Sequence, residues 1–125
     1  MFKFVPKILA LSGIYFHIPF CSKACSYCDF HFSTSLNLKN QVLEAMKKEL
    51  EIRLETTEWT KLNSLYFGGG TPSLLSAAEI DTLLSPLQKR FDLGQIEFTL
   101  EANPDDLTLD KLRDFKATGV NRLSI

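Results

Sequence analysis

The sequence lacks a long hydrophobic run and a surplus of charge of one sign. None of its apolar stretches approaches the roughly 20 residues that a membrane-spanning helix needs, so we expect no transmembrane segment. Its 14 basic and 15 acidic residues give a net charge of −1. No block of like charges stands out, and this balance does not favour electrostatic capture of nucleic acid. With 45% hydrophobic and 23% charged residues over 125 positions, the composition is typical of one globular domain.

Cysteine is absent from all but one short segment. Cys21, Cys25 and Cys28 lie within eight residues, and the sequence has no other cysteine. An odd number of cysteines argues against a disulfide framework and for a reduced compartment. The apolar stretch Ile8–Leu11 is too short for an export signal and no credible cleavage site follows it, so we expect a cytoplasmic protein.

Three thiolates are also one ligand short of a closed metal site. Thiolates select zinc or iron–sulfur centres, and a structural zinc site takes four protein ligands. The three cysteines therefore favour an iron–sulfur cluster with one iron open to a substrate or cofactor. A Cys3His zinc site completed by His17 or His31 is an alternative on spacing alone, and so are unrelated buried cysteines.

Hydrophobic patterning predicts strands that alternate with helices. Runs of β-branched and aromatic residues predict strands at 14–18, 64–67, 96–100 and 120–125. This alternation is the mark of an α/β fold with a parallel sheet and right-handed crossovers. We expect residues 1–12 to be an N-terminal extension and residues 13–125 to be the first part of a larger domain, poorly stable alone, because no helix covers the fourth strand.

The helices are predicted between these strands. Apolar residues four apart predict a helix over 38–56, capped by Ser35 or Asn37; they are Leu38, Val42, Met46, Leu50 and Leu54. Ser76 and Glu79 have the spacing of a capping box and open a second helix that ends near Arg90. Its apolar residues are Ile80, Leu83, Leu84 and Leu87. A third helix is predicted over 108–117, with Gly119 as its C-terminal stop.

Three loops that follow successive strands are expected to converge, because ligands bind at the carboxyl ends of parallel strands. They are the cysteine loop, the loop Gly68–Ser73 and the segment that begins at Glu101. Consecutive glycines let a backbone approach a ligand closely, and Thr71 adds a hydroxyl, although a tight turn would also explain the glycines. The spacings of a Walker loop and of a dinucleotide fingerprint are missing.

Two further sets of side chains are candidates for ligand contact. Glu101 can accept hydrogen bonds from a cationic or hydroxyl-bearing ligand, or it can be a solvated loop acid. Tyr15 and His17 lie two residues apart on the first predicted strand, so they point to the same side of it. Packing in the core explains this pair at least as well as ligand contact.

Three motifs in this order carry a resemblance to a known family. They are Tyr15–Cys21 continued by Cys25, Tyr27 and Cys28, then Gly68–Ser73, then Glu101–Pro104. Together they resemble the radical S-adenosylmethionine (SAM) enzymes, and among these the oxygen-independent coproporphyrinogen III oxidase family. The resemblance covers nearly the whole chain from Gly13 onward and argues against the zinc alternative. It implies a partial, TIM-like (β/α)6 barrel, of which this chain supplies about three and a half units.

The resemblance also implies a cofactor set. A 4Fe-4S cluster would be held by Cys21, Cys25 and Cys28, with SAM bound through its amino and carboxylate groups to the open iron. The reduced cluster would give one electron to the sulfonium, releasing methionine and a 5′-deoxyadenosyl radical. The implied SAM-binding residues are Tyr15, Tyr27, Gly69, Gly70, Thr71 and Glu101. An electron donor such as flavodoxin or ferredoxin and a heme or porphyrinogen partner would complete the system.

One departure from the oxidase pattern bears on the activity. The true oxidases carry a fourth cysteine two residues after the third, where this sequence has Phe30. This cysteine pattern, together with Glu101–Pro104, is more similar to that of the HemW branch, whose members bind and transfer heme as chaperones. The sequence therefore favours a heme chaperone over an enzyme that decarboxylates porphyrinogen propionates, which stays the alternative.

Overall fold

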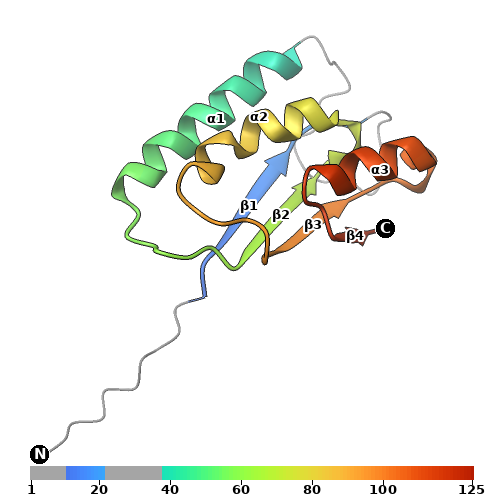
Figure 1. Ribbon diagram of the computed structural model, residues 1–125. Coiled ribbons are helices and arrows are strands. Elements are labelled where there is room, and N and C mark those ends of the chain that lie inside the picture. The colour runs from blue at the N-terminus through green and yellow to red at the C-terminus, as the bar shows by residue number, and fades with distance from the viewer. Residues whose placement is uncertain (1–10, 22–37) are drawn as a thin grey trace, which may run out of the picture.

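A four-stranded parallel sheet covered on one face by three α-helices forms the fold of the computed structural model, which describes residues 11–21 and 38–125 (Figure 1). The strands are β1 (Gly13–Ile18), β2 (Ser64–Gly69), β3 (Glu97–Glu101) and β4 (Arg122–Ser124), and they lie side by side in sequence order. Each neighbouring pair is parallel. Right-handed crossovers between strands in this order place every helix on the same face, as in a barrel wound in one direction. The predicted α/β class is confirmed.

The helices are α1 (Lys39–Thr56), α2 (Ala77–Gln88) and α3 (Leu109–Ala117), with short 3-10 turns at Pro72–Leu74 and Pro104–Asp106. The capping box of α2 is confirmed, because the Glu79 N–H donates to the Ser76 hydroxyl and the Ser76 N–H donates to the Glu79 carboxylate. Gly119 follows α3 with a φ of +105°, the left-handed geometry predicted for a C-terminal stop. None of the helices in the described ranges is long and apolar enough to cross a membrane.

The buried stripe of α1 differs from the predicted one. Leu50 and Leu54 are buried as expected, but Leu43 takes the place of Leu38, which is 56% exposed. An α-helix turns by about 100° per residue, so residues spaced by four drift by about 40° at each step and leave a common face. The start of α1 also carries no side-chain cap at the residue that precedes it, and the two predicted caps lie outside the described residues.

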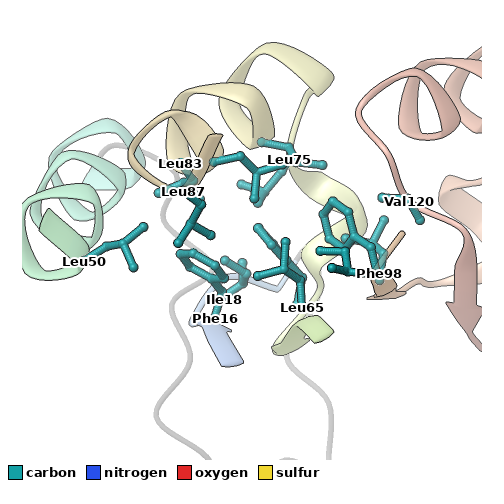
Figure 2. Packing of buried hydrophobic residues seen from close by; sticks show 14 of the residues in the cluster. Phe16, Ile18, Leu50, Leu65, Leu75, Leu83, Leu87, Phe98 and Val120 are labelled. Atoms are coloured by element: carbon teal, nitrogen blue, oxygen red, sulfur yellow. The ribbon is translucent and has the colours of Figure 1, made fainter. Parts of the chain in front are cut away.

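The core lies between the sheet and the helices (Figure 2). Alternate strand residues supply its lower layer: Phe16, Ile18, Leu65, Phe67, Phe98 and Leu100. The four apolar residues predicted for α2 are all buried above them. Phe67 is central, because its ring centroid lies 4.5 Å from that of Phe16 and 5.2 Å from that of Phe98.

The face of the sheet that carries no helix presents polar and aromatic side chains. Pairing register places Tyr15 beside Tyr66 and Tyr66 beside Thr99, all on this face. Tyr15 is 56% exposed and His17 is exposed too, so the two side chains share one side of β1 as predicted. The alternative that they pack in the core is wrong, because the odd-numbered residues of β1 point away from the helices.

Candidate functional site

The loops after β2 and β3 converge as predicted, around a cavity of about 260 Å³ at the carboxyl ends of the strands. Its walls come from the two loops and from the end of β4: Gly70, Thr71, Pro72, Glu101, Ala102, Asn103, Ser124 and Ile125. Cys21 lies at the same edge of the sheet, because a Cβ placed on Gly70 would be 2.9 Å from its sulfur. Cys25, Cys28 and Tyr27 lie outside the described residues.

The backbone N–H groups of the glycine loop are engaged within the protein. The Gly70 N–H donates to the Ile18 carbonyl at 2.7 Å, and the Thr71 N–H donates to the Phe20 carbonyl at 2.6 Å. The Gly69 N–H donates to the Glu101 carboxylate at 3.1 Å. The loop is therefore fastened to the residues after β1 and to the end of β3. With these N–H groups engaged, Gly70 and Thr71 border the cavity beside the Glu101 carboxylate, which is an acceptor, and the Thr71 hydroxyl can accept or donate.

Glycine is required in this loop by side chains of β1 and β2 and by the residues that follow β1. A Cβ on Gly68 would come within 2.9 Å of the rings of both Tyr15 and Tyr66. A Cβ on Gly70 would meet the buried Cys21 sulfur at the same distance. Real Cβ atoms essentially never approach other heavy atoms below 3.0 Å. The glycines thus let the tyrosine rings pack directly against the end of β2 and let Cys21 pack against Gly70, which a simple tight turn would not require.

Glu101 is the last residue of β3, and its half-buried carboxylate is held by two donors. The Tyr66 hydroxyl donates to one oxygen at 2.7 Å, and the Gly69 N–H donates to the other at 3.1 Å. Among the ion pairs of the described residues, none involves Glu101. The carboxylate is therefore fixed in position without an internal cation, unlike a freely solvated loop acid, and it borders the cavity.

The tyrosines near Glu101 titrate above their ordinary range. The hydrogen bond to Glu101 raises the pKa of Tyr66, with smaller opposing effects from Ser124 and Arg122. Burial raises the pKa of Tyr15, and the charge of Glu101 adds to this effect. Both hydroxyls consequently stay protonated at neutral pH and can act as hydrogen-bond donors.

Three residues that support the site were missed by the sequence reasoning: Ser73, Asp106 and Tyr66. Ser73 is completely buried, and its hydroxyl donates to Asp106 at 2.8 Å while accepting from the Asn103 N–H at 3.1 Å. Tyr66 is the third, and strand alternation could have placed it on the same face as Tyr15. Ser73 and Asp106 are 33 residues apart, and no local pattern links them.

A larger hollow of about 610 Å³ lies elsewhere, between β1 and α1. Tyr15 and His17 line it, but the glycine loop and Glu101 do not. The cavity at the strand ends therefore fits the expected chemistry better than the larger one. No cluster of three metal-ligating side chains occurs within residues 11–21 and 38–125, a range that contains only the first of the three cysteines.

Comparison with known proteins places this site in context. The family model of the radical SAM superfamily matches residues 15–125. The heme chaperone HemW of Lactococcus lactis is 41% identical over 115 residues, which are 91% of this chain and 30% of that protein. HemW of Bacillus subtilis is 37% identical over 119 residues, 91% of this chain and 31% of that protein. The chain thus spans about a third of the length of these curated relatives.

Two other similar proteins extend the comparison. The mitochondrial "radical S-adenosyl methionine domain-containing protein 1" of Danio rerio is 37% identical over 123 residues, 97% of this chain and 28% of that protein. Among solved structures, coproporphyrinogen III oxidase (HemN) from Escherichia coli, described as a radical SAM enzyme, superposes with a TM-score of 0.78 at 34% identity. The match covers 90% of this chain and 26% of that one. The sheet and helices described above therefore match part of a radical SAM fold.

Proposed function

The chain belongs to the radical SAM superfamily, and we propose that it is part of a heme chaperone that binds a 4Fe-4S cluster and SAM. One observation carries the proposal. The family match extends from Tyr15 to the end of the chain and so includes the three cysteines. The similar proteins that cover this same stretch are named as heme chaperones. The superfamily implies the cluster and SAM in general, and the proposal assigns them to residues of this chain.

Cys21, Cys25 and Cys28 would hold the cluster. Thiolates are the usual ligands of iron–sulfur clusters, and three of them leave one iron free for another ligand. Cys21 suits this role because its sulfur packs directly beside the backbone of Gly70, at the edge where the loops converge. When bound and reduced, such a cluster supplies one electron to the sulfonium of SAM, with flavodoxin or ferredoxin as the proposed electron source.

The methionine end of SAM would lie in the cavity at the strand ends. The Glu101 carboxylate and the Thr71 hydroxyl border this cavity, and Gly69 and Gly70 would contribute backbone carbonyls beside them, since their N–H groups are used internally. An α-ammonium group has donors and no acceptor, so it complements these groups. Tyr15 would contact the cofactor from the open face of the sheet, and Tyr27 would present its backbone to the adenine.

A heme chaperone fits the sequence better than a porphyrinogen decarboxylase. Phe30 stands where the oxidase pattern has a fourth cysteine. The similarity to the E. coli oxidase structure keeps decarboxylation as the second candidate, because the fold that positions the cofactor is shared.

The test uses the full-length protein with its cluster reconstituted without oxygen. We expect added heme to bind and to shift its visible absorption band, and we expect coproporphyrinogen III, incubated with SAM and a reductant, to remain unconverted. Formation of protoporphyrinogen would refute the chaperone proposal and support the oxidase. Absence of heme binding together with absence of conversion would refute both.

A further inference from the structure

The hydroxyl of Tyr66 has a specific partner at the edge of the candidate site. It donates to Oε1 of Glu101 at 2.7 Å, a short distance that is typical of a hydrogen bond to a charged acceptor. The Gly69 N–H engages the other carboxylate oxygen. Together these two donors restrict the rotation of the carboxylate, because Tyr66 holds one of its oxygens and Gly69 holds the other.

Tyr66 is itself held in place by its surroundings. Its ring is stacked on that of Tyr15, with centroids 5.7 Å apart and planes inclined by 24°. Gly68 leaves the space that both rings occupy. Thr99 lies opposite Tyr66 in the neighbouring strand and on the same face of the sheet. Packing of the Tyr66 ring therefore directs its hydroxyl along this face of the sheet toward Glu101.

We propose that Tyr66 is a positioning residue, whose hydroxyl holds the Glu101 carboxylate in the orientation that receives the α-ammonium group of SAM. The inference rests on the proposed function, because it takes SAM as the ligand. A carboxylate has about four lone-pair sites, so two internal donors leave sites for the ligand. Fixing the carboxylate before binding removes an entropic cost that a freely rotating side chain would add to association.

The chemistry of the phenol suits this role. Glu101 raises the pKa of Tyr66, so the proton that orients the carboxylate is retained at neutral and mildly alkaline pH. The Tyr15 hydroxyl has a different neighbour, because it lies 3.4 Å from Nδ1 of His17. Of these aromatic residues, Tyr66 is the one that donates a hydrogen bond to Glu101.

The test compares the full-length, cluster-loaded protein with its Tyr66→Phe variant, which keeps the ring stack and loses only the hydroxyl. We expect the dissociation constant for SAM to rise by about tenfold, the size of a lost hydrogen bond to a charged group. An analogue of SAM that has hydrogen in place of the α-amino group should bind both proteins equally. A merely structural effect would weaken the two ligands alike.

A double-mutant cycle separates action through Glu101 from action at a distance. In a Glu101→Ala background, Tyr66→Phe should cause no further loss of SAM affinity. Thr99→Val is the matched control, because it removes a neighbouring hydroxyl that has no hydrogen-bond partner within the described residues, and it should leave SAM affinity unchanged. Equal SAM binding by wild type and Tyr66→Phe, or equal loss for both ligands, would overturn the inference alone. Failure of the wild type to bind SAM would refute the proposed function and the inference with it.

Discussion

The hydroxyl of Ser73 donates a hydrogen bond to the carboxylate of Asp106 at 2.8 Å and so joins the loop after β2 to the loop after β3. The same oxygen accepts from the N–H of Asn103 at 3.1 Å. Ser73 is fully buried, so water cannot replace these contacts. Ser73 therefore joins the two loops that line the candidate site, in addition to the bond from the Gly69 N–H to Glu101.

Replacing Ser73 with alanine should loosen this connection. The partly buried Asn103 N–H and Asp106 carboxylate would lose the Ser73 hydroxyl as a partner, and we expect the free energy of unfolding to fall by about 1–3 kcal/mol. Affinity for SAM should fall as well, because both walls of the cavity become mobile. Denaturant unfolding and equilibrium binding of the full-length protein measure the two effects.

Ser85→Ala is the matched control for Ser73→Ala. Its hydroxyl donates to the Thr82 carbonyl at 2.8 Å, one turn away within α2 and far from the loops in sequence. We expect a change in unfolding free energy below about 0.5 kcal/mol and unaltered SAM binding. Similar behaviour of the two variants would show that the link between the loops has no special role.

Gly70→Ala should impair assembly of the cluster. The new methyl group would overlap the carbonyl of Phe20 and lie 2.9 Å from the Cys21 sulfur, so the cysteine segment must shift. We expect lower iron and sulfide content after anaerobic reconstitution. In the control Gly94→Ala, the methyl group meets only the end of the Asp92 side chain, at 3.2 Å, and iron content should be normal. Full loading of Gly70→Ala would contradict the proposed packing of cysteine against glycine.

The carboxylate of Glu79 should make stability dependent on pH. Partial burial opposes its ionisation, but hydrogen bonds from Lys39 and Ser76 outweigh this effect and lower the pKa of Glu79 below its ordinary value of 4.5. The stabilisation is therefore present above pH 4.5 and is lost as the pH falls through the lowered value. Glu79→Gln should cost about 1 kcal/mol at pH 7, and this difference should disappear in acid.

Glu49→Gln provides the comparison for Glu79→Gln. Glu49 pairs with Arg53 on the exposed surface of α1, with side-chain exposures of 59% and 75%. Pairs of this kind contribute little, so we expect less than about 0.5 kcal/mol at either pH. Urea denaturation at both pH values supplies the measurement. A pH-independent deficit in Glu79→Gln would mean that the capping geometry matters and the charge does not.

The titration of Tyr66 offers a test of its bond to Glu101 that needs no ligand. With tyrosine labelled by 13C at the ring carbon that carries the hydroxyl, the Tyr66 signal is assigned by its absence in Tyr66→Phe. Because the hydrogen bond to Glu101 raises the pKa of Tyr66, Glu101→Ala should lower it toward the ordinary value of 10.0. An unchanged titration would place the phenol proton elsewhere.

Local sequence patterns predicted most of the fold, and their failures have physical causes. Strand alternation placed Phe16 in the core, and the capping box located the start of α2, because both signals act over a few residues. The four-residue spacing misplaced Leu38, since it departs from the helical repeat of 3.6 residues. Convergence of the loops was predictable from the parallel topology alone.

The hydrogen bonds within the site were not predictable from the sequence. The bond from Tyr66 to Glu101 spans 35 positions, and it depends on the register between β2 and β3. That register is set by tertiary packing and has no local signature. The roles assigned to the three cysteines and to the SAM-binding residues remain predictions, because two of the cysteines lie outside the described part of the chain.

The most direct test of the account is electron paramagnetic resonance of the reduced, full-length protein, reconstituted with iron and sulfide without oxygen. We predict about four iron atoms per protein and a spectrum that changes when SAM is added, and we predict that alanine at Cys21, Cys25 or Cys28 abolishes both. A preparation that retains zinc, or a cluster whose spectrum does not change when SAM is added, would contradict the proposal of a SAM-binding 4Fe-4S cluster.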